Sequence, residues 1–162
     1  MHGINIVLVV GITLWSGVVP ASPPLGTGER LARTAMALVS IAEFGNIGSR
    51  DADCRGTPFP VTNVSRLVDD EIAPVLRSLG RADTRSNPKK LDEMISMLKA
   101  IPQIQHDGAL PIQRLYDQKK QEATVAFGQS GRCASLSSMV QTVMQQRRLE
   151  LKEISELLSR TK

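Results

Sequence analysis

The chain has 162 residues, a formal net charge of +4 and two cysteines. A single domain is expected at this length, and the combination of 22% charged with 41% hydrophobic residues argues against a wholly disordered chain. Two cysteines are too few for a small scaffold that depends on many disulfides.

An uncharged apolar run occupies residues 4–19. It is shorter than the ~20 residues that a membrane-spanning helix needs, and it is typical of the apolar core of a secretory signal peptide. Small residues follow the run, and Ala21 best fits the cleavage rule. We therefore expect a signal peptide over residues 1–21 and one domain over residues 22–162. A retained N-terminal anchor is the alternative, because no Lys or Arg precedes the run.

Two helices are predicted in the first half of this domain. Apolar residues recur at helical spacing over residues 28–44, and Gly45 follows as a helix end. Residues 45–61 are rich in Gly, Pro and polar residues, which predicts a long loop. A second apolar stripe predicts a helix over residues 64–79. Pro74 should kink that helix, because proline lacks the N–H and clashes with the preceding turn.

Three further helices are predicted in the second half. An Asn-Pro pair at residues 87–88 indicates a helix start, and Pro102 should end that helix. The next helix is expected over residues 111–127, closed by Gly128. After a short loop, the longest helix is expected over residues 134–159.

The predicted fold class is all-α. No segment shows a sustained alternation of polar and apolar residues, so no strand is expected. Short connections between amphipathic helices favour a four- to five-helix bundle with antiparallel neighbours. The apolar stripes that should face the core include Phe127 and Leu157 near the ends of the last two helices.

The two cysteines predict a disulfide. Cys54 lies in the first long loop and Cys133 lies just before the last helix. Exported chains meet oxidising surroundings, where two cysteines usually pair, and an intramolecular bond leaves one connectivity. Free or intermolecularly paired thiols are the alternative. A redox-active pair is disfavoured, because the sequence has no CxxC spacing.

Catalytic and metal-binding motifs are not evident. Beyond the predicted signal the chain has one histidine, His106, in a predicted loop beside Asp107. No second histidine or further ligand at a metal-site spacing supports this pair. Three consecutive carboxylates at residues 69–71 point in different directions on a helix. We therefore expect no metal, no cofactor and no enzymatic activity.

The spread of charge argues against nucleic-acid binding. Basic pairs are scattered along the chain and interleaved with acids, and few aromatic residues are available for stacking. The sequence instead favours an exported, periplasmic or secreted protein that binds another protein of the envelope or extracellular space through its helix faces. Such a protein would be an envelope or secretion accessory, a chaperone-like module, or an inhibitor or immunity module.

Three residues are predicted to contact that partner. Arg148 and Leu149 lie beside the core stripe of the last helix, and Met97 lies off the stripe of the third. The alternative function is a secreted effector or helical signalling factor that acts outside the producing cell. A carrier of an apolar ligand inside the bundle is a further alternative.

Overall fold

The computed structural model describes residues 26–83, 86–106 and 111–161, and these ranges form helices without any strand. The all-α bundle is therefore confirmed. Its elements are α2 (Thr27–Arg50), η1 (Ala52–Cys54), α3 (Val64–Leu67), η2 (Val68–Ile72), α4 (Ala73–Ala82), α5 (Pro88–His106) and α6 (Ile112–Arg160). The predicted signal peptide lies outside the described residues.

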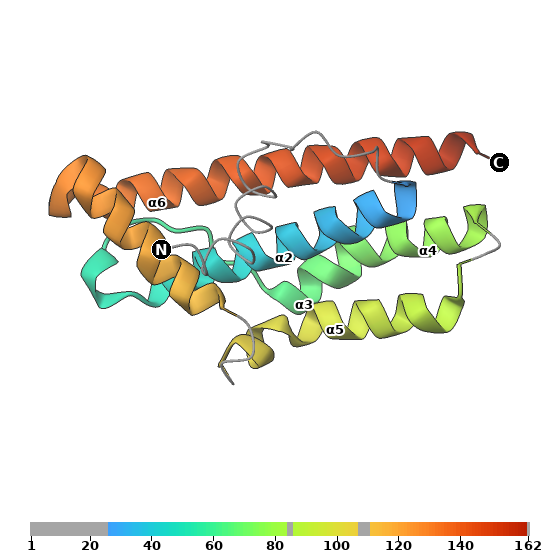
Figure 1. The fold of residues 1–162 in the computed structure, drawn as a ribbon, viewed down its shortest axis with the longest axis horizontal. Coiled ribbons are helices and arrows are strands. Elements are labelled where there is room, and N and C mark those ends of the chain that lie inside the picture. Colours follow the sequence, from blue (N-terminus) through green and yellow to red (C-terminus); the bar gives the residue numbers. More distant parts are fainter. Residues whose placement is uncertain (1–25, 84–85, 107–110, 162) are drawn as a thin grey trace, which may run out of the picture.

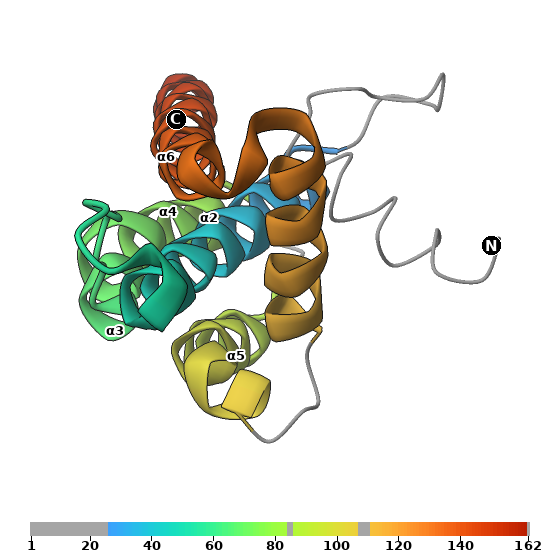
Figure 2. The same ribbon diagram turned by 90° about the vertical axis from the view of Figure 1, so that its left-hand side faces the viewer.

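Helix α2 is the centre of the bundle. The long C-terminal part of α6 runs beside it on one side and α5 lies on the other (Figure 1). Figure 2 shows that α3 and α4 flank α2 and that the first part of α6 stands across the ends of α2 and α5. Because neighbours surround α2, its polar Thr34, Glu43 and Asn46 are buried together with its apolar residues. From Thr34 to Gly48 none of the α2 residues is exposed, whereas Glu29 and Arg33 near its start are.

Helix α2 is longer than predicted, because it continues through Gly45 to Arg50. Gly45 is helical, and its missing side chain makes room for a neighbour. A Cβ there would lie 2.9 Å from the carbonyl oxygen of Pro60 and 3.0 Å from Val140 of α6. At Gly48 a Cβ would lie 2.4 Å from the ring of Phe59. These glycines mark a close approach of the following loop to the helix.

The predicted kink at Pro74 takes the form of a wide turn. The five residues of η2 form a π-helix that ends directly before α4, and Pro74 is in the first turn of α4. A π turn gives room for the proline ring, which would clash with the carbonyl four residues earlier in a regular helix. The whole apolar stripe predicted for this segment is buried. Its members are Val64, Leu67, Val68, Ile72, Val75, Leu76 and Leu79.

Helix α5 begins where predicted and ends later. The Asn87 side chain accepts a hydrogen bond from the backbone N–H of Lys89 at 3.0 Å, which caps the helix start. Pro102 does not end the helix, which runs on to His106. One proline removes a single backbone hydrogen bond, and the burial of Ile101 holds this turn in place.

Gly128 breaks α6, as predicted, but it is the only non-helical residue there. Its φ of 75° and ψ of 175° turn the chain sharply, and the predicted loop over residues 129–133 is instead helical. Glycine adopts such a φ without strain. Phe127, predicted to face inward, lies at this turn and is 61% exposed. Leu157 is likewise exposed, whereas Leu158 beside it is buried, so the inward face of this turn passes through Leu158.

A buried polar group joins α6 to α2. Arg147 interrupts the apolar stripe of α6, yet only 5% of it is exposed. Its Nη1 donates to both carboxylate oxygens of Glu150, at 2.7 and 2.9 Å. Glu150 also accepts from the Thr34 hydroxyl of α2 at 3.4 Å. The charge of Arg147 is thus compensated inside the bundle, as buried charges require.

Among the described helices, none is both long enough and apolar enough to cross a bilayer. Some apolar side chains are partly buried and pack against the core. They are Met36, Leu91, Met94, Leu115 and Met139.

We predict that Gly48→Ala destabilises the protein by about 2 kcal/mol. The new methyl group would overlap the buried Phe59 ring, and overpacking costs ~1–3 kcal/mol. Gly28→Ala on the same helix is the control, because its Cβ would meet Leu79 at an ordinary 3.4 Å. Urea unfolding followed by circular dichroism measures both. Equal stability of Gly48→Ala and wild type would contradict the close approach.

Candidate functional site

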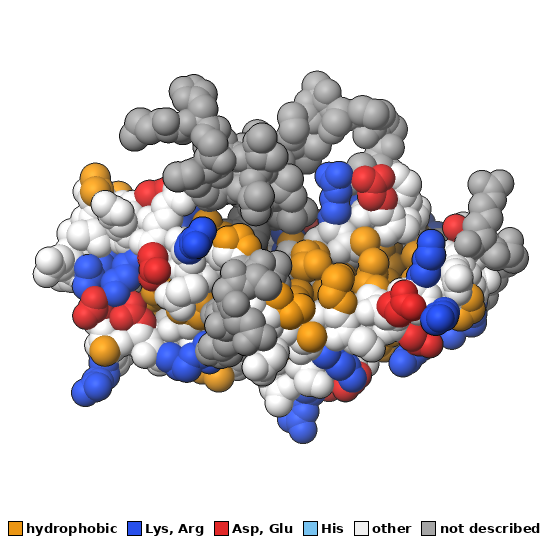
Figure 3. Space-filling model, turned by 60° about the horizontal axis from the view of Figure 1, so that its bottom comes forward, with side chains coloured by type: hydrophobic (Ala, Val, Ile, Leu, Met, Phe, Trp, Pro, Cys, Tyr) orange, Lys and Arg blue, Asp and Glu red, His pale blue; other side chains and the backbone are white. Residues whose placement is uncertain are grey.

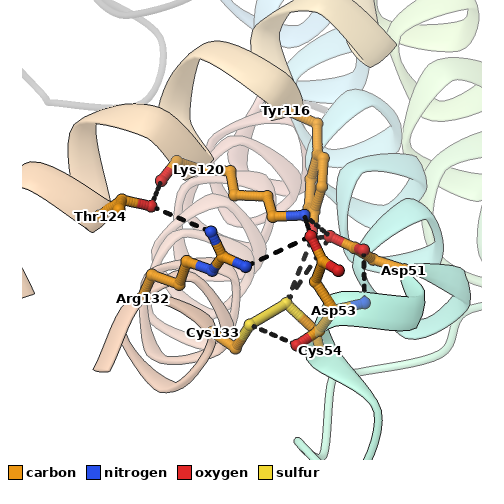
Figure 4. Close-up of a disulfide and its surroundings, with 8 residues drawn as sticks. All are labelled: Asp51, Asp53, Cys54, Tyr116, Lys120, Thr124, Arg132 and Cys133. Carbon is orange, nitrogen blue, oxygen red and sulfur yellow. Dashed lines mark hydrogen bonds and ion pairs between the residues drawn. A yellow bond between two sulfur atoms is a disulfide. The ribbon is translucent and has the colours of Figure 1, made fainter. Parts of the chain in front are cut away.

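A disulfide ties the loop after α2 to α6. The sulfur atoms of Cys54 and Cys133 are 2.09 Å apart and the Cα atoms are 5.4 Å apart, across a sequence separation of 79 residues. The predicted pairing is therefore confirmed. Figure 4 shows the bond between the end of η1 and the helix that follows Gly128. It fixes one end of residues 51–63, the segment that we call the clamp loop.

Charged side chains cover this disulfide (Figure 4). The Lys120 ammonium donates to Asp51 and to Asp53, at 2.7 Å each. Arg132 donates to Asp53 at 3.2 Å, and the Tyr116 hydroxyl donates to Asp51 at 2.8 Å. The two acids come from the clamp loop and the other three residues from both halves of α6. The cluster therefore joins the loop to α6 on either side of the Gly128 turn.

The pKa values in this cluster reflect its pairing. Burial alone would raise the pKa of Asp51, but hydrogen bonds from Lys120 and Tyr116 outweigh it and hold that pKa below its ordinary value. Burial, followed by the hydrogen bond to Asp51, raises the pKa of Tyr116 far above its usual range. Burial opposes the charge of Lys120, yet its bonds to the two acids raise its pKa. Each group is thus held in its ordinary charge state at neutral pH.

The cluster borders a small polar cavity of about 260 Å³, lined in part by Asp51, Tyr116 and Lys120. These side chains already bind one another, so a ligand would have to displace an existing bond. None of the three has its pKa moved towards neutrality, as a general acid or base would require. The arrangement is therefore suited to holding the clamp loop in place.

A larger groove lies between the clamp loop and α6. Its volume is about 560 Å³, within the ~300–1,000 Å³ of typical ligand clefts. The lining residues recur every three or four positions along α6 and thus share one face of that helix. They are Gln141, Met144, Gln145, Arg148, Leu149 and Lys152 from α6, with Pro60, Val61 and Thr62 from the clamp loop.

Three contacts besides the disulfide hold the loop side of this groove. Asn46 of α2 binds Thr62 twice, by accepting from its N–H and by donating to its C=O, both at 2.8 Å. Glu43, only 2% exposed, accepts from the same Asn46 amide group at 3.1 Å and so orients it. Ser137 of α6 donates to the Pro58 carbonyl at 2.8 Å. The loop edge of the groove is therefore preorganised.

The groove combines exposed apolar side chains with positive charge. Val61 is 75% exposed and Leu149 is 56% exposed, one on each side. Arg148 donates two hydrogen bonds to Glu71 of η2, at 2.8 and 2.9 Å, so its charge is compensated. Lys152 makes no ion pair within the described part of the chain. The groove lining includes no carboxylate.

The structure brings together two of the three predicted contact residues. Arg148 and Leu149 both line the groove. Met97 is 43% exposed, but it lies on α5, across the bundle from the long part of α6. Figure 3 brings the α5 side of the molecule forward and shows apolar side chains gathered in a band with charged groups around it. Met97 therefore does not belong to the same site.

The three consecutive acids of η2 serve to join helices. Asp69 pairs with Lys99 of α5, Glu71 pairs with Arg148 of α6, and Asp70 lies exposed between them. Across residues 26–83, 86–106 and 111–161, no group of three or more His, Cys, Asp or Glu side chains is arranged to hold a metal ion.

Sequence reasoning missed the loop side of the groove. Val61 and Thr62 belong to no periodic stripe, so their position depends on the folding of the clamp loop against α2. The sequence did not indicate Lys152 as a groove residue either, because similar lysines occur along the whole chain. Comparison with protein-family models, with curated proteins and with solved structures found no match for this chain.

We predict that replacing both Cys54 and Cys133 with Ala lowers the free energy of unfolding by about 4–5 kcal/mol. The disulfide closes a long loop and so restricts the unfolded chain. Guanidinium unfolding measures the loss. Reduction of the wild type should give a similar loss and leave the double variant unchanged; an unchanged unfolding midpoint in the double variant would contradict the prediction.

We predict that Asp51 contributes to acid unfolding. Its pKa is lower in the folded state, so its stabilising effect is present above the unfolded-state value near ~4 and is lost as pH falls through the folded value. Asp51→Asn should therefore lower stability at pH 7 and flatten the decline in stability between about pH 5 and pH 2. Urea titrations across this range test it, with the exposed Asp92→Asn as control. A decline as steep as that of wild type would contradict the assignment.

Proposed function

We propose that this protein is an exported interaction module that binds another protein through the groove between the clamp loop and α6. The single observation that carries the proposal is the pair of exposed apolar side chains, Val61 and Leu149, on opposite sides of that groove. Apolar side chains that are exposed in the free protein and set beside polar groups are typical of binding surfaces.

The construction of the groove supports a binding role. Both of its sides are fixed before any partner arrives, one by the α6 helix and the other by the disulfide and by Asn46. A preorganised surface loses little conformational freedom on binding, which favours affinity. Met144, buried beneath the exposed residues, provides a pliable floor for an apolar side chain.

The disulfide also supports export to an oxidising compartment. Disulfides persist in oxidising compartments such as the bacterial periplasm or the extracellular space. Together with the apolar run at residues 4–19, this favours an exported protein. A tagged chain expressed in its host should appear in the periplasmic or extracellular fraction with residues 1–21 removed, as N-terminal sequencing would show. A full-length chain retained in the cytoplasm would count against export.

We predict that Leu149→Asp lowers partner affinity at least tenfold and leaves the fold intact, because it places a charge in the apolar part of the groove. A photo-reactive residue at position 149 would capture the partner in the host, and mass spectrometry would identify it. Titration calorimetry with that partner then measures the loss for the variant.

Leu157→Asp is the matched control. Leu157 is a similarly exposed leucine on the same helix, outside the groove, so its variant should bind as wild type does. Equal binding by Leu149→Asp and wild type would overturn the proposal. The same holds if a photo-reactive residue at position 157 captures a partner and one at position 149 does not.

A further inference from the structure

We infer that the occupant of this groove is an extended segment of the partner that carries a carboxylate and pairs through its backbone with Val61. The inference rests on the proposed function, because it names the kind of partner that the same groove takes. The carrying feature is the backbone N–H and C=O of Val61, which bind no other group among the described residues.

The backbone of the clamp loop faces α2 at every second residue. The Pro60 carbonyl oxygen approaches Gly45, and the N–H and C=O of Thr62 both bind Asn46. In an extended chain the N–H and C=O of one residue point to the same side, and those of the next residue point to the opposite side. Residues 60–62 have no helical or turn structure. The N–H and C=O of Val61 therefore point away from α2.

Those two groups have no partner within the described chain. In an extended segment, such a pair of groups corresponds to one rung of a β-ladder, with the donor and acceptor spaced for a neighbouring strand. An extended peptide can satisfy both with two hydrogen bonds, as in recognition by strand addition. A helix cannot do so along its length, because its backbone groups are bonded within the helix.

The side chains around Val61 determine which side chains of the bound peptide the groove favours. Met144 and Leu149 give an apolar surface for one side chain of the peptide, and Gln141 and Gln145 offer amide groups for its backbone or polar side chains. Lys152 is the uncompensated charge of the groove, because Arg148 is bound to Glu71. An Asp or Glu next to an apolar residue complements both features.

The experiment selects linear twelve-residue peptides from a random displayed library against the purified protein and measures their affinity by fluorescence anisotropy. The selected peptides should carry Asp or Glu beside an apolar residue. The decisive variant is Val61→Pro, which removes the free N–H, keeps an apolar side chain at this position and suits an extended backbone. Thermal unfolding first checks that the variant is folded.

We predict that Val61→Pro weakens peptide binding about tenfold, which is the effect of one lost hydrogen bond. Val61→Ile keeps the N–H and should bind within about twofold of wild type.

Lys152→Glu should also weaken binding, whereas Lys90→Glu on α5 should not. On peptide binding, NMR should show slower hydrogen exchange at the Val61 amide.

The inference is overturned if no peptide binds, if Val61→Pro binds as tightly as wild type, or if the bound peptides are helical. These outcomes are separate from those of the proposed function. A partner that is captured at position 149 and lost in Leu149→Asp, but that binds Val61→Pro normally, would leave the groove as the interface and exclude the extended segment. A failure to capture any partner at position 149 would count against the proposed function itself.

Discussion

The close approach of the clamp loop to α2 is the constraint on which the groove depends. It exists because Gly45 and Gly48 have no side chains at the points where Pro60 and Phe59 pack. With Phe59 seated there, the chain reaches Asn46, which binds Thr62 on both of its backbone groups. Any larger residue at those glycines would push the loop outward and widen or remove the groove.

The disulfide and the charge cluster stabilise the other end of the same loop. Cys54 is joined to α6 covalently, and Asp51 and Asp53 are joined to it through Lys120 and Arg132. A chain segment without regular structure would otherwise lose much of its order, because each fixed residue costs roughly 1–2 kcal/mol of conformational entropy. The covalent bond reduces that cost by restricting the unfolded chain as well. The loop can therefore present Val61 in a fixed position.

Polar residues within the bundle also help to fix the position of the groove. Glu43 orients the Asn46 amide, and Glu150 of α6, which also pairs with Arg147 of its own helix, accepts a hydrogen bond from Thr34 of α2. Such groups favour one arrangement, because a shift of α6 along α2 would break the hydrogen bond between Thr34 and Glu150. The two sides of the groove come from α6 and from the loop bound to α2, so the relative position of these two helices sets its width.

Features that depend on contacts within one helix were predictable from the sequence, and features that depend on contacts between distant segments were not. Helix stripes were predictable, because apolar spacing of three and four residues reports on one helix alone. The start of α5 and the break at Gly128 were predictable for the same local reason. Gly45 and Pro102 were misassigned as helix ends, since a glycine or a proline in a helix is acceptable when packing elsewhere compensates. Phe127 and Leu157 were misassigned to the core: Phe127 lies at the Gly128 turn, and at the end of α6 the inward position belongs to Leu158.

The sequence by itself determined an all-α bundle, its main apolar stripes and a single possible disulfide pairing, and it indicated Arg148 and Leu149 as exposed residues beside the core of the last helix. These properties follow from local spacing and from the number of cysteines. Only the tertiary structure decided that a loop would lie opposite Leu149, that Arg148 would be compensated by Glu71 and that the N–H and C=O of Val61 would bind no other group among the described residues. The physical reason is that these features depend on contacts between segments far apart in the chain, and a single sequence does not report such contacts.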